Sequence, residues 1–234
     1  MNIVSIDWLE KNLENSEVII LDCSWHLPNT NRSGTQEFLK ERIPSAIFFD
    51  IDEICDKKSP YPHMIPDENY FSQKVSELGI LNNHHIITYD TLGVFSSARV
   101  YWMFKQFSHK KISILNGGLK YWKLNNKKLE TSEPQKNKKT QYIAKLDRSK
   151  IKRFEDIENN IKHKKFKLID ARPSGRFNGI DPEPRIEIKS GNIKDSINIP
   201  FSSVINSETG CFKDQEELEK IFDNNQVKKK DDIV

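Results

Sequence analysis

The sequence predicts an α/β protein built from two tandem domains, each a parallel sheet with helices on both faces. Short apolar runs alternate with amphipathic segments in the first half, and such runs are typical of buried parallel strands. The second half repeats this order of elements. We expect a first domain at 1–126, a linker at 127–148 and a second, incomplete domain at 149–234.

The first half contains apolar runs of strand length, each followed by polar residues. They cover residues 18–21, 47–49, 86–89 and 112–115. Ser5 is expected to cap a helix that runs to Leu13, and Asp67 a helix that ends at Gly79. Further helices are predicted around 37–40, from 96 to 107 and around 121–122.

The second half matches the first at a nearly constant spacing. Residues 21–22 correspond to 169–170, residues 42–47 to 192–197, and residues 84–87 to 231–234. A repeat of this length indicates tandem domains and not a solenoid. The first copy continues well past residue 87, whereas the second stops at Val234, so we expect the chain to be truncated inside a strand.

Composition narrows the choice of partners and compartment. The net charge is only +3, from 37 basic and 34 acidic residues, so neither a nucleic acid nor a membrane surface is indicated. No apolar run approaches the ~20 residues of a membrane helix. Three well-separated cysteines and no signal-like start predict a cytoplasmic protein. No His, Cys and Asp cluster has ligand spacing, so no metal or organic cofactor is expected.

A loop rich in Arg, Pro and Gly follows the predicted strand at 167–170. Four arginines lie in or near it: Arg153, Arg172, Arg176 and Arg185. Several guanidinium groups at the carboxyl end of a parallel strand predict a site for a small anion. The alternative is an ordinary connector whose arginines pair with the nearby acids Asp170, Asp181 and Glu183.

The turn between a parallel strand and its helix is a second place for chemistry. Backbone N–H groups gather there, so a cysteine in this turn is held as thiolate. Asp90 occupies the position in the first half, where it could equally be a simple helix-start cap. The matching position in the second half lies three residues beyond Val234. Cysteines 23, 55 and 211 fall outside such turns, so we expect no catalytic role for them.

Several longer segments carry a resemblance. They are residues 4–9, 42–46, 50–52, 59–64, 89–90, 115–119, 170–172, 176–177 and 182–185. In this order, they make the chain resemble the tandem-domain sulfurtransferases of the rhodanese family, and more closely the branch that uses 3-mercaptopyruvate. One departure is Asn192, where the family usually has histidine.

The resemblance implies a ping-pong reaction. A cysteine of the second domain takes sulfane sulfur from a small anionic donor, 3-mercaptopyruvate or thiosulfate, as a persulfide. It then passes the sulfur to cyanide or to a thiol, such as thioredoxin or a small thiol. By motif, Arg176 and Arg185 hold the donor's carboxylate and keto oxygens. Arginine at 185 favours mercaptopyruvate, since the thiosulfate branch tends to carry an acid there.

The resemblance also implies a supporting role for Asp52 and His63, which would orient a proton-relaying serine of the cysteine loop. Without it, His63 would be interpreted as a loop histidine bonded to a backbone carbonyl. The cysteine loop is expected just after Val234, so the 234-residue chain is predicted to be inactive.

Two other interpretations stay open. The chain could be a non-catalytic rhodanese-like module that binds a partner or an anion. A phosphatase-like relative would need a cysteine followed six residues later by an arginine, and the chain has no such pair.

Overall fold

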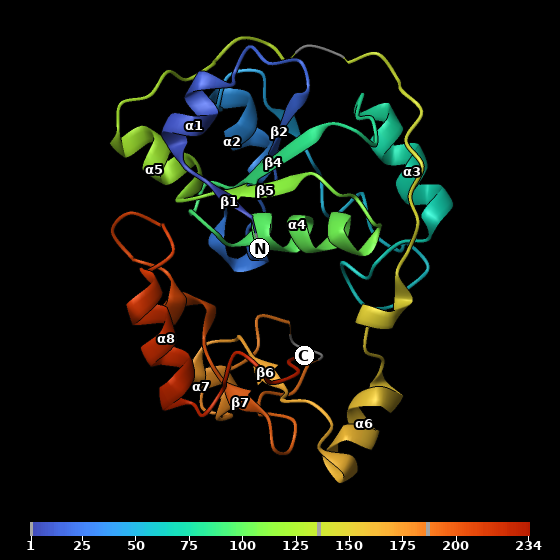
Figure 1. The fold of residues 1–234 in the computed structure, drawn as a ribbon, viewed down its shortest axis with the longest axis vertical. Coiled ribbons are helices and arrows are strands. Elements are labelled where there is room, and N and C mark those ends of the chain that lie inside the picture. The colour runs from blue at the N-terminus through green and yellow to red at the C-terminus, as the bar shows by residue number, and fades with distance from the viewer. Residues whose placement is uncertain (1, 135–136, 186–187) are drawn as a thin grey trace. The chain divides into compact units, whose positions relative to one another are not determined.

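The computed structural model describes residues 2–134, 137–185 and 188–234 (Figure 1). These residues form two compact units. The first unit comprises Met1–Arg148 with Thr209–Cys211, and the second comprises Ser149–Glu208 with Phe212–Val234. The predicted boundaries at 126 and 149 stay a prediction.

The first unit is built on a five-stranded sheet in the order β1-β5-β4-β2-β3, with every neighbouring pair parallel. The strands are β1 (Ile3–Val4), β2 (Val18–Asp22), β3 (Ile47–Phe48), β4 (His85–Tyr89) and β5 (Ile112–Leu115). The parallel α/β sheet predicted for this half is therefore confirmed. Its longer strands coincide with the apolar runs because both of their faces are covered.

Helices cover both faces of this sheet. They are α1 (Ile6–Lys11), α2 (Gly34–Lys40), α3 (Glu68–Glu77), α4 (Ser96–Gln106) and α5 (Gly118–Leu124), with a 3₁₀ turn at Pro28–Thr30. Ser5 and Asp67 cap α1 and α3 as expected. The helix predicted to reach Leu13 ends at Lys11, and α2 begins at Gly34 because Ser33 caps it.

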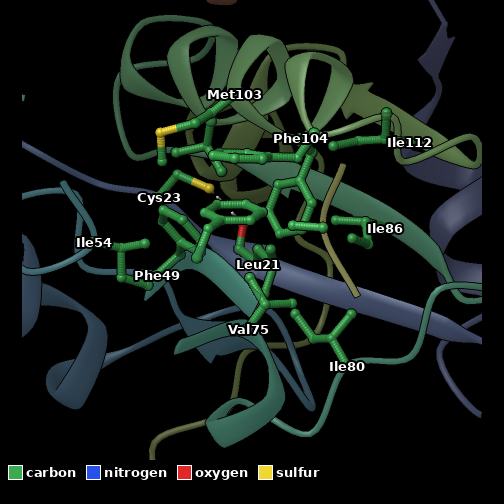
Figure 2. Close-up of a cluster of buried hydrophobic side chains, with 14 of the residues drawn as sticks. Leu21, Cys23, Phe49, Ile54, Val75, Ile80, Ile86, Met103, Phe104 and Ile112 are labelled. Carbon is green, nitrogen blue, oxygen red and sulfur yellow. Dashed lines mark hydrogen bonds between the residues drawn. The ribbon is translucent and has the colours of Figure 1, made fainter. Parts of the chain in front are cut away.

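The alternation of side chains along each strand divides the apolar core in two. One part packs Leu21 and Ile86 against α3 and α4, and Figure 2 shows Cys23 enclosed in it near Phe49 and Met103. The other part lies under α1, α2 and α5, with Trp122 at its centre. Figure 1 shows α4 on one side of the sheet and α1 and α2 on the other.

The segment predicted as a linker packs on the first unit. Glu130 forms a β-bridge with Arg42, and the backbone N–H of the buried Tyr142 donates to the Ser76 hydroxyl oxygen at 2.9 Å. These contacts attach the described parts of the segment to the residues before β3 and to α3.

The second unit has a much smaller sheet. Its two parallel strands are β6 (Ile169–Asp170) and β7 (Ile197–Asn198). Its helices are α6 (Phe154–His163), α7 (Ser174–Phe177) and α8 (Gln215–Asn224), with 3₁₀ turns at Arg148–Lys150 and Phe201–Val204. The strand predicted at 167–170 is thus shorter than expected, although Lys167 forms a parallel bridge with Ile233.

The internal repeat is visible in the strand register. Ile19 pairs with Ile86 in the first unit, and the corresponding Lys167 pairs with Ile233 in the second. Leu21 pairs with Ile47, just as Ile169 pairs with Ile197. The turn before β3 and the turn before β7 each contain a residue with left-handed backbone, with φ of 63° at Ser45 and 64° at Asp195. The spacing found in the sequence therefore corresponds to a repeated structure.

The two units differ in how much apolar surface they bury. Among the described residues, Ile199 and Val227 are the buried apolar side chains of the second unit, while the first unit has a large core. We expect trypsin to cleave residues 149–234 at least ~10-fold faster than residues 2–148, because local opening needs little free energy there. Mass spectrometry of a limited digest checks this. Equal resistance of the two parts would contradict it.

Asp22 at the end of β2 makes stability depend on pH. Its side chain is fully buried, and burial raises the pKa from the ordinary 3.8 to about 6, although the Ser24 N–H donates to its Oδ1 at 2.9 Å. The folded state therefore binds this proton more tightly than the unfolded state does. The resulting stabilisation is fully present below pH 3.8 and is lost as the pH rises through about 6.

Substituting Asp22→Asn should remove this dependence. Between pH 4 and pH 8, the unfolding free energy of the variant relative to the parent should rise by roughly 2–3 kcal/mol, because only the parent must ionise a buried carboxyl group. Urea denaturation at both pH values measures the difference. A gap that stays constant with pH would show that Asp22 is already ionised at low pH.

Candidate functional site

Asp52 and His63 are brought together by two loops of the first unit. His63 Nε2 lies 2.5 Å from Asp52 Oδ1, and the indole Nε1 of Trp25 donates to both oxygens of the same carboxylate, at 3.2 and 3.0 Å. The imidazole therefore pairs with a carboxylate and not with a backbone carbonyl. The side chain of Asp52 is 64% exposed, so solvent or a ligand can reach the pair.

The local backbone explains this arrangement. The carboxylate of Asp50 accepts the N–H groups of Asp52 and Glu53, which fixes a turn directly after β3. His63 has a left-handed backbone with φ of 57°, and its carbonyl accepts Arg99 Nη2 at 2.6 Å. The His63 ring also packs against the Trp25 ring in a T-shaped arrangement, with 4.9 Å between ring centroids. A positioned imidazole beside a carboxylate can accept and return a proton.

The candidate anion loop of the second unit begins at Asp170, the last residue of β6. Arg172 Nε donates to both Asp170 oxygens at 3.0 Å, and its Nη2 lies 2.5 Å from Oδ2. Burial opposes ionisation, but the hydrogen bonds and charge of Arg172 hold the pKa of Asp170 below its usual range. Arg172 Nη2 also donates to the carbonyl of Gly191 at 2.7 Å. Arg172 is thus attached to both the strand end and the far side of the loop.

Glu183 joins Arg172 to Arg176. Its Oε1 accepts Arg172 Nη1 at 2.7 Å, while its Oε2 accepts Arg176 Nε at 2.9 Å and Arg176 Nη2 as well. The Glu183 side chain is only 3% exposed. The hydrogen bond and charge of Arg176, together with Arg172, lower the pKa of Glu183, so the carboxylate is ionised at neutral pH.

The predicted arginines therefore have different surroundings. The connector alternative is right in that Arg172 and Arg176 pair with Asp170 and Glu183. Arg185 is exposed, and its guanidinium has no hydrogen bond to another described residue.

The other two residues of this prediction have structural roles. Arg153 is the residue directly before α6, where its backbone N–H donates to the Asp156 carboxylate at 2.9 Å. Asp181 forms no ion pair in the described part of the chain. Its carboxylate lies so close to Gly175 that a Cβ there would be 1.8 Å from Oδ2, so a larger residue at this position would displace the Asp181 side chain.

The carboxylate of Asp90 fills the turn between β4 and α4. Oδ1 accepts the N–H groups of Leu92 and Gly93 at 2.9 and 3.1 Å. Oδ2 accepts the N–H of Phe95 at 2.7 Å, and the N–H and hydroxyl of Ser97 at 2.9 and 2.6 Å. The turn thus surrounds an anion with five donors, and that anion is the chain's own aspartate.

The three cysteines are poorly suited to act as thiolates. Cys23 is fully buried, and burial raises its pKa well above the ordinary value. Burial also raises the pKa of Cys55 and of the partly buried Cys211. A raised pKa reduces the fraction of the nucleophilic thiolate at neutral pH.

Sequence reasoning missed Trp25 and Arg99, which hold Asp52 and His63. Trp25 stands just after β2, at the same sheet edge as the turn that carries Asp52, and this placement was the available signal. Within the described ranges, no group of three or more His, Cys, Asp or Glu side chains could hold a metal ion. No helix in those ranges is long and apolar enough to span a membrane.

The chain matches the Rhodanese-like domain family over residues 5–125. It is 39% identical over 235 residues to the 3-mercaptopyruvate sulfurtransferase of Rattus norvegicus, and 40% identical over 232 residues to the thiosulfate sulfurtransferase of Bos taurus. Each alignment covers 96% of this chain and 77% of the relative. The identities are so similar that they do not separate the two donors.

The chain is also similar to solved structures of sulfurtransferases with the rhodanese fold. SseA from Escherichia coli, a 3-mercaptopyruvate sulfurtransferase with the rhodanese fold, is 31% identical with a TM-score of 0.89, covering 99% of this chain and 86% of that one. Tum1 from Saccharomyces cerevisiae is also 31% identical with a TM-score of 0.89, and the match covers 97% of this chain and 81% of Tum1.

Proposed function

Because this chain belongs to the rhodanese family of sulfurtransferases, we propose that it binds 3-mercaptopyruvate as the donor in a sulfur transfer to a thiol or cyanide. In that chemistry, a cysteine thiolate attacks the sulfur of the donor and forms a persulfide. The carbon–sulfur bond breaks, its electron pair leaves with the enolate of pyruvate, and a proton then converts the enolate to pyruvate.

Arg176 and Arg185 bind the donor in this proposal. Mercaptopyruvate presents a carboxylate and a keto oxygen, and planar guanidinium groups suit both through paired N–H donors. The observation that carries the proposal is Arg176 of α7, whose plane is fixed by the buried Glu183 in the loop that follows this helix. Arg185 is exposed two residues beyond Glu183, which leaves its charge available to a ligand.

Asp52 and His63 serve proton transfer in this proposal. The carboxylate holds the imidazole in one orientation. A pair of this kind suits the orientation of a proton-relaying hydroxyl, or the return of a proton to the enolate.

The sulfur acceptor belongs to the class of thiols. Thioredoxin or a small thiol fits a reaction in which the acceptor attacks the outer sulfur of the persulfide as a thiolate. Such acceptors are abundant in a reducing compartment, so we place the protein in the cytoplasm.

The 234-residue chain itself should bind the donor without turning it over. This proposal rests on burial, because Cys23, Cys55 and Cys211 all have raised pKa values. Incubation with 3-mercaptopyruvate and dithiothreitol should release pyruvate no faster than the uncatalysed reaction. Clear turnover would identify one of these cysteines as the nucleophile, and single Cys→Ser variants would show which one.

Donor binding is tested with pyruvate, which carries no transferable sulfur, and with thiosulfate, which should stay intact because the chain is expected to lack a reactive thiolate. Isothermal titration should show that Arg185→Asp weakens pyruvate binding by at least ~10-fold and weakens thiosulfate binding less. Only pyruvate has the carboxylate and the adjacent keto oxygen that the Arg185 guanidinium is proposed to bind. Arg148→Asp, a matched change at an exposed arginine outside the loop, should leave both affinities unchanged. Equal losses for the two anions with Arg185→Asp would contradict the preference for mercaptopyruvate.

A further inference from the structure

We infer that Glu183 is a positioning residue, which sets the orientation of Arg176 for anion binding. This assignment rests on the proposed function, in which Arg176 binds the donor. Among the described residues of the loop, Glu183 is the most enclosed charged group, with a side chain only 3% exposed, and it bridges two guanidinium groups. The carboxylate is shielded from water, and its contacts with two arginines keep it from rotating.

The contacts of Glu183 select one edge of the Arg176 guanidinium. Glu183 Oε2 takes the Nε and Nη2 donors along one side of the group. A guanidinium has five N–H donors, so Nη1 and the second hydrogen of Nη2 form a separate edge. No described residue accepts a hydrogen bond from Nη1, and the Arg176 side chain is 23% exposed. That edge has the paired geometry that a carboxylate requires.

The orientation of Glu183 is itself fixed from the other side. Its Oε1 is bound by Arg172, which is held in turn by Asp170 at the end of β6 and by the Gly191 carbonyl. A continuous set of ionic hydrogen bonds therefore connects the sheet to Arg176. Without the Glu183 charge, at most one acceptor oxygen would remain for the two guanidinium groups, and the long Arg176 side chain could then adopt other rotamers.

The opposite role for Glu183 is also testable. If its carboxylate merely occupied the place of the substrate anion, removing the charge would free Arg176 and strengthen anion binding. A positioning role predicts weaker binding instead. The sign of the change in pyruvate affinity therefore decides between the two roles.

The test uses the full chain, pyruvate as the probe, and the variant Glu183→Gln, which keeps the shape and removes the charge. Isothermal titration should give a dissociation constant raised by ~10-fold or more, as expected for loss of a charge-assisted hydrogen bond. The ¹⁵N-edited spectrum of arginine side chains should show the Arg176 Nε–H signal exchanging faster with water, which a purely structural role elsewhere would not produce. Glu216→Gln is the control, because Glu216 forms an exposed ion pair with Lys220 on α8 of the same unit.

Each outcome has a definite meaning. If the parent chain binds no pyruvate, the proposed function fails and this assignment fails with it. If the parent binds and Arg176→Gln abolishes binding, but Glu183→Gln binds within ~2-fold of the parent, only the positioning role is wrong. Tighter binding by Glu183→Gln would show that Glu183 occupies the anion position. Should Glu183→Gln fail to fold, Glu183→Asp keeps the charge and withdraws it by one methylene, so parent-like pyruvate binding by that variant would overturn the assignment.

Discussion

Replacing Asp90 with asparagine should destabilise the first unit by about 3 kcal/mol or more. Five donors converge on the Asp90 carboxylate, and three of them meet at Oδ2. Asparagine replaces one of these oxygens with an amide NH₂ group, which would face the N–H groups of Phe95 and Ser97 donor to donor. Buried donors that lose an ionised acceptor cost about 1–3 kcal/mol each before the turn relaxes.

Tryptophan fluorescence during urea denaturation measures this effect on the first unit alone. All four tryptophans lie there, at positions 8, 25, 102 and 122. Asp67→Asn is the matched control, because Asp67 caps α3 and asparagine is an equally good cap. A loss of less than 1 kcal/mol for Asp90→Asn would mean that the turn does not depend on an anion.

Removing Glu130 should have a similarly large effect, about 3 kcal/mol. The side chain of its partner Arg42 is only 1% exposed, and Nη2 donates at 2.6 Å to both Glu130 Oε1 and the Ser132 carbonyl. Glu130→Ala would leave a buried guanidinium without its counter-ion, which is far more costly than replacing the whole pair. Glu130 also accepts the N–H of Ser45, so the turn before β3 would lose a contact as well.

The same fluorescence experiment checks this prediction. Glu41→Ala removes the exposed ion pair with Lys123 and should cost less than 1 kcal/mol, as surface pairs usually do. Combining Arg42→Met with Glu130→Ala should recover much of the loss, because no unpaired charge then remains. Additive losses in the double variant would show that the pair contributes through packing and not through charge.

The sequence predicted the first unit well because its signals were local and mutually consistent. The buried strands are short apolar runs, and Ser5 and Asp67 stand where helices begin. The spacing matched segments of the two halves with each other, and the pairing of Lys167 with Ile233 repeats the pairing of Ile19 with Ile86. Periodicity and caps suffice when strands are covered on both faces.

The second unit was harder to predict. The predicted strand at 167–170 has only two apolar residues, Leu168 and Ile169, and β6 is limited to Ile169–Asp170. The sequence offered Asp170, Asp181 and Glu183 as partners for the arginines, but a loop rich in proline and glycine does not reveal which acid reaches which guanidinium. Only the structure shows that Glu183 pairs with the arginines and that Asp181 instead lies against Gly175.

The candidate site of the first unit was predicted from resemblance and not from pattern. Nothing local in the sequence connects Asp52 with His63, because their contact depends on how two loops fold back over the sheet edge. The roles of Asp52, His63, Arg176 and Arg185 in catalysis and binding stay predictions.

Four side chains at and after the end of β6 are joined by ion pairs and have no net charge. The two positive charges of Arg172 and Arg176 are matched by the carboxylates of Asp170 and Glu183. Such a quartet attracts a distant anion only weakly, and screening by salt shortens its reach further. Any preference of Arg176 for one anion over another must therefore arise at short range. It depends on the angle at which the guanidinium edge formed by Nη1 and Nη2 meets two oxygen atoms of the anion. Selectivity of this kind depends on shape, so it should change little with ionic strength.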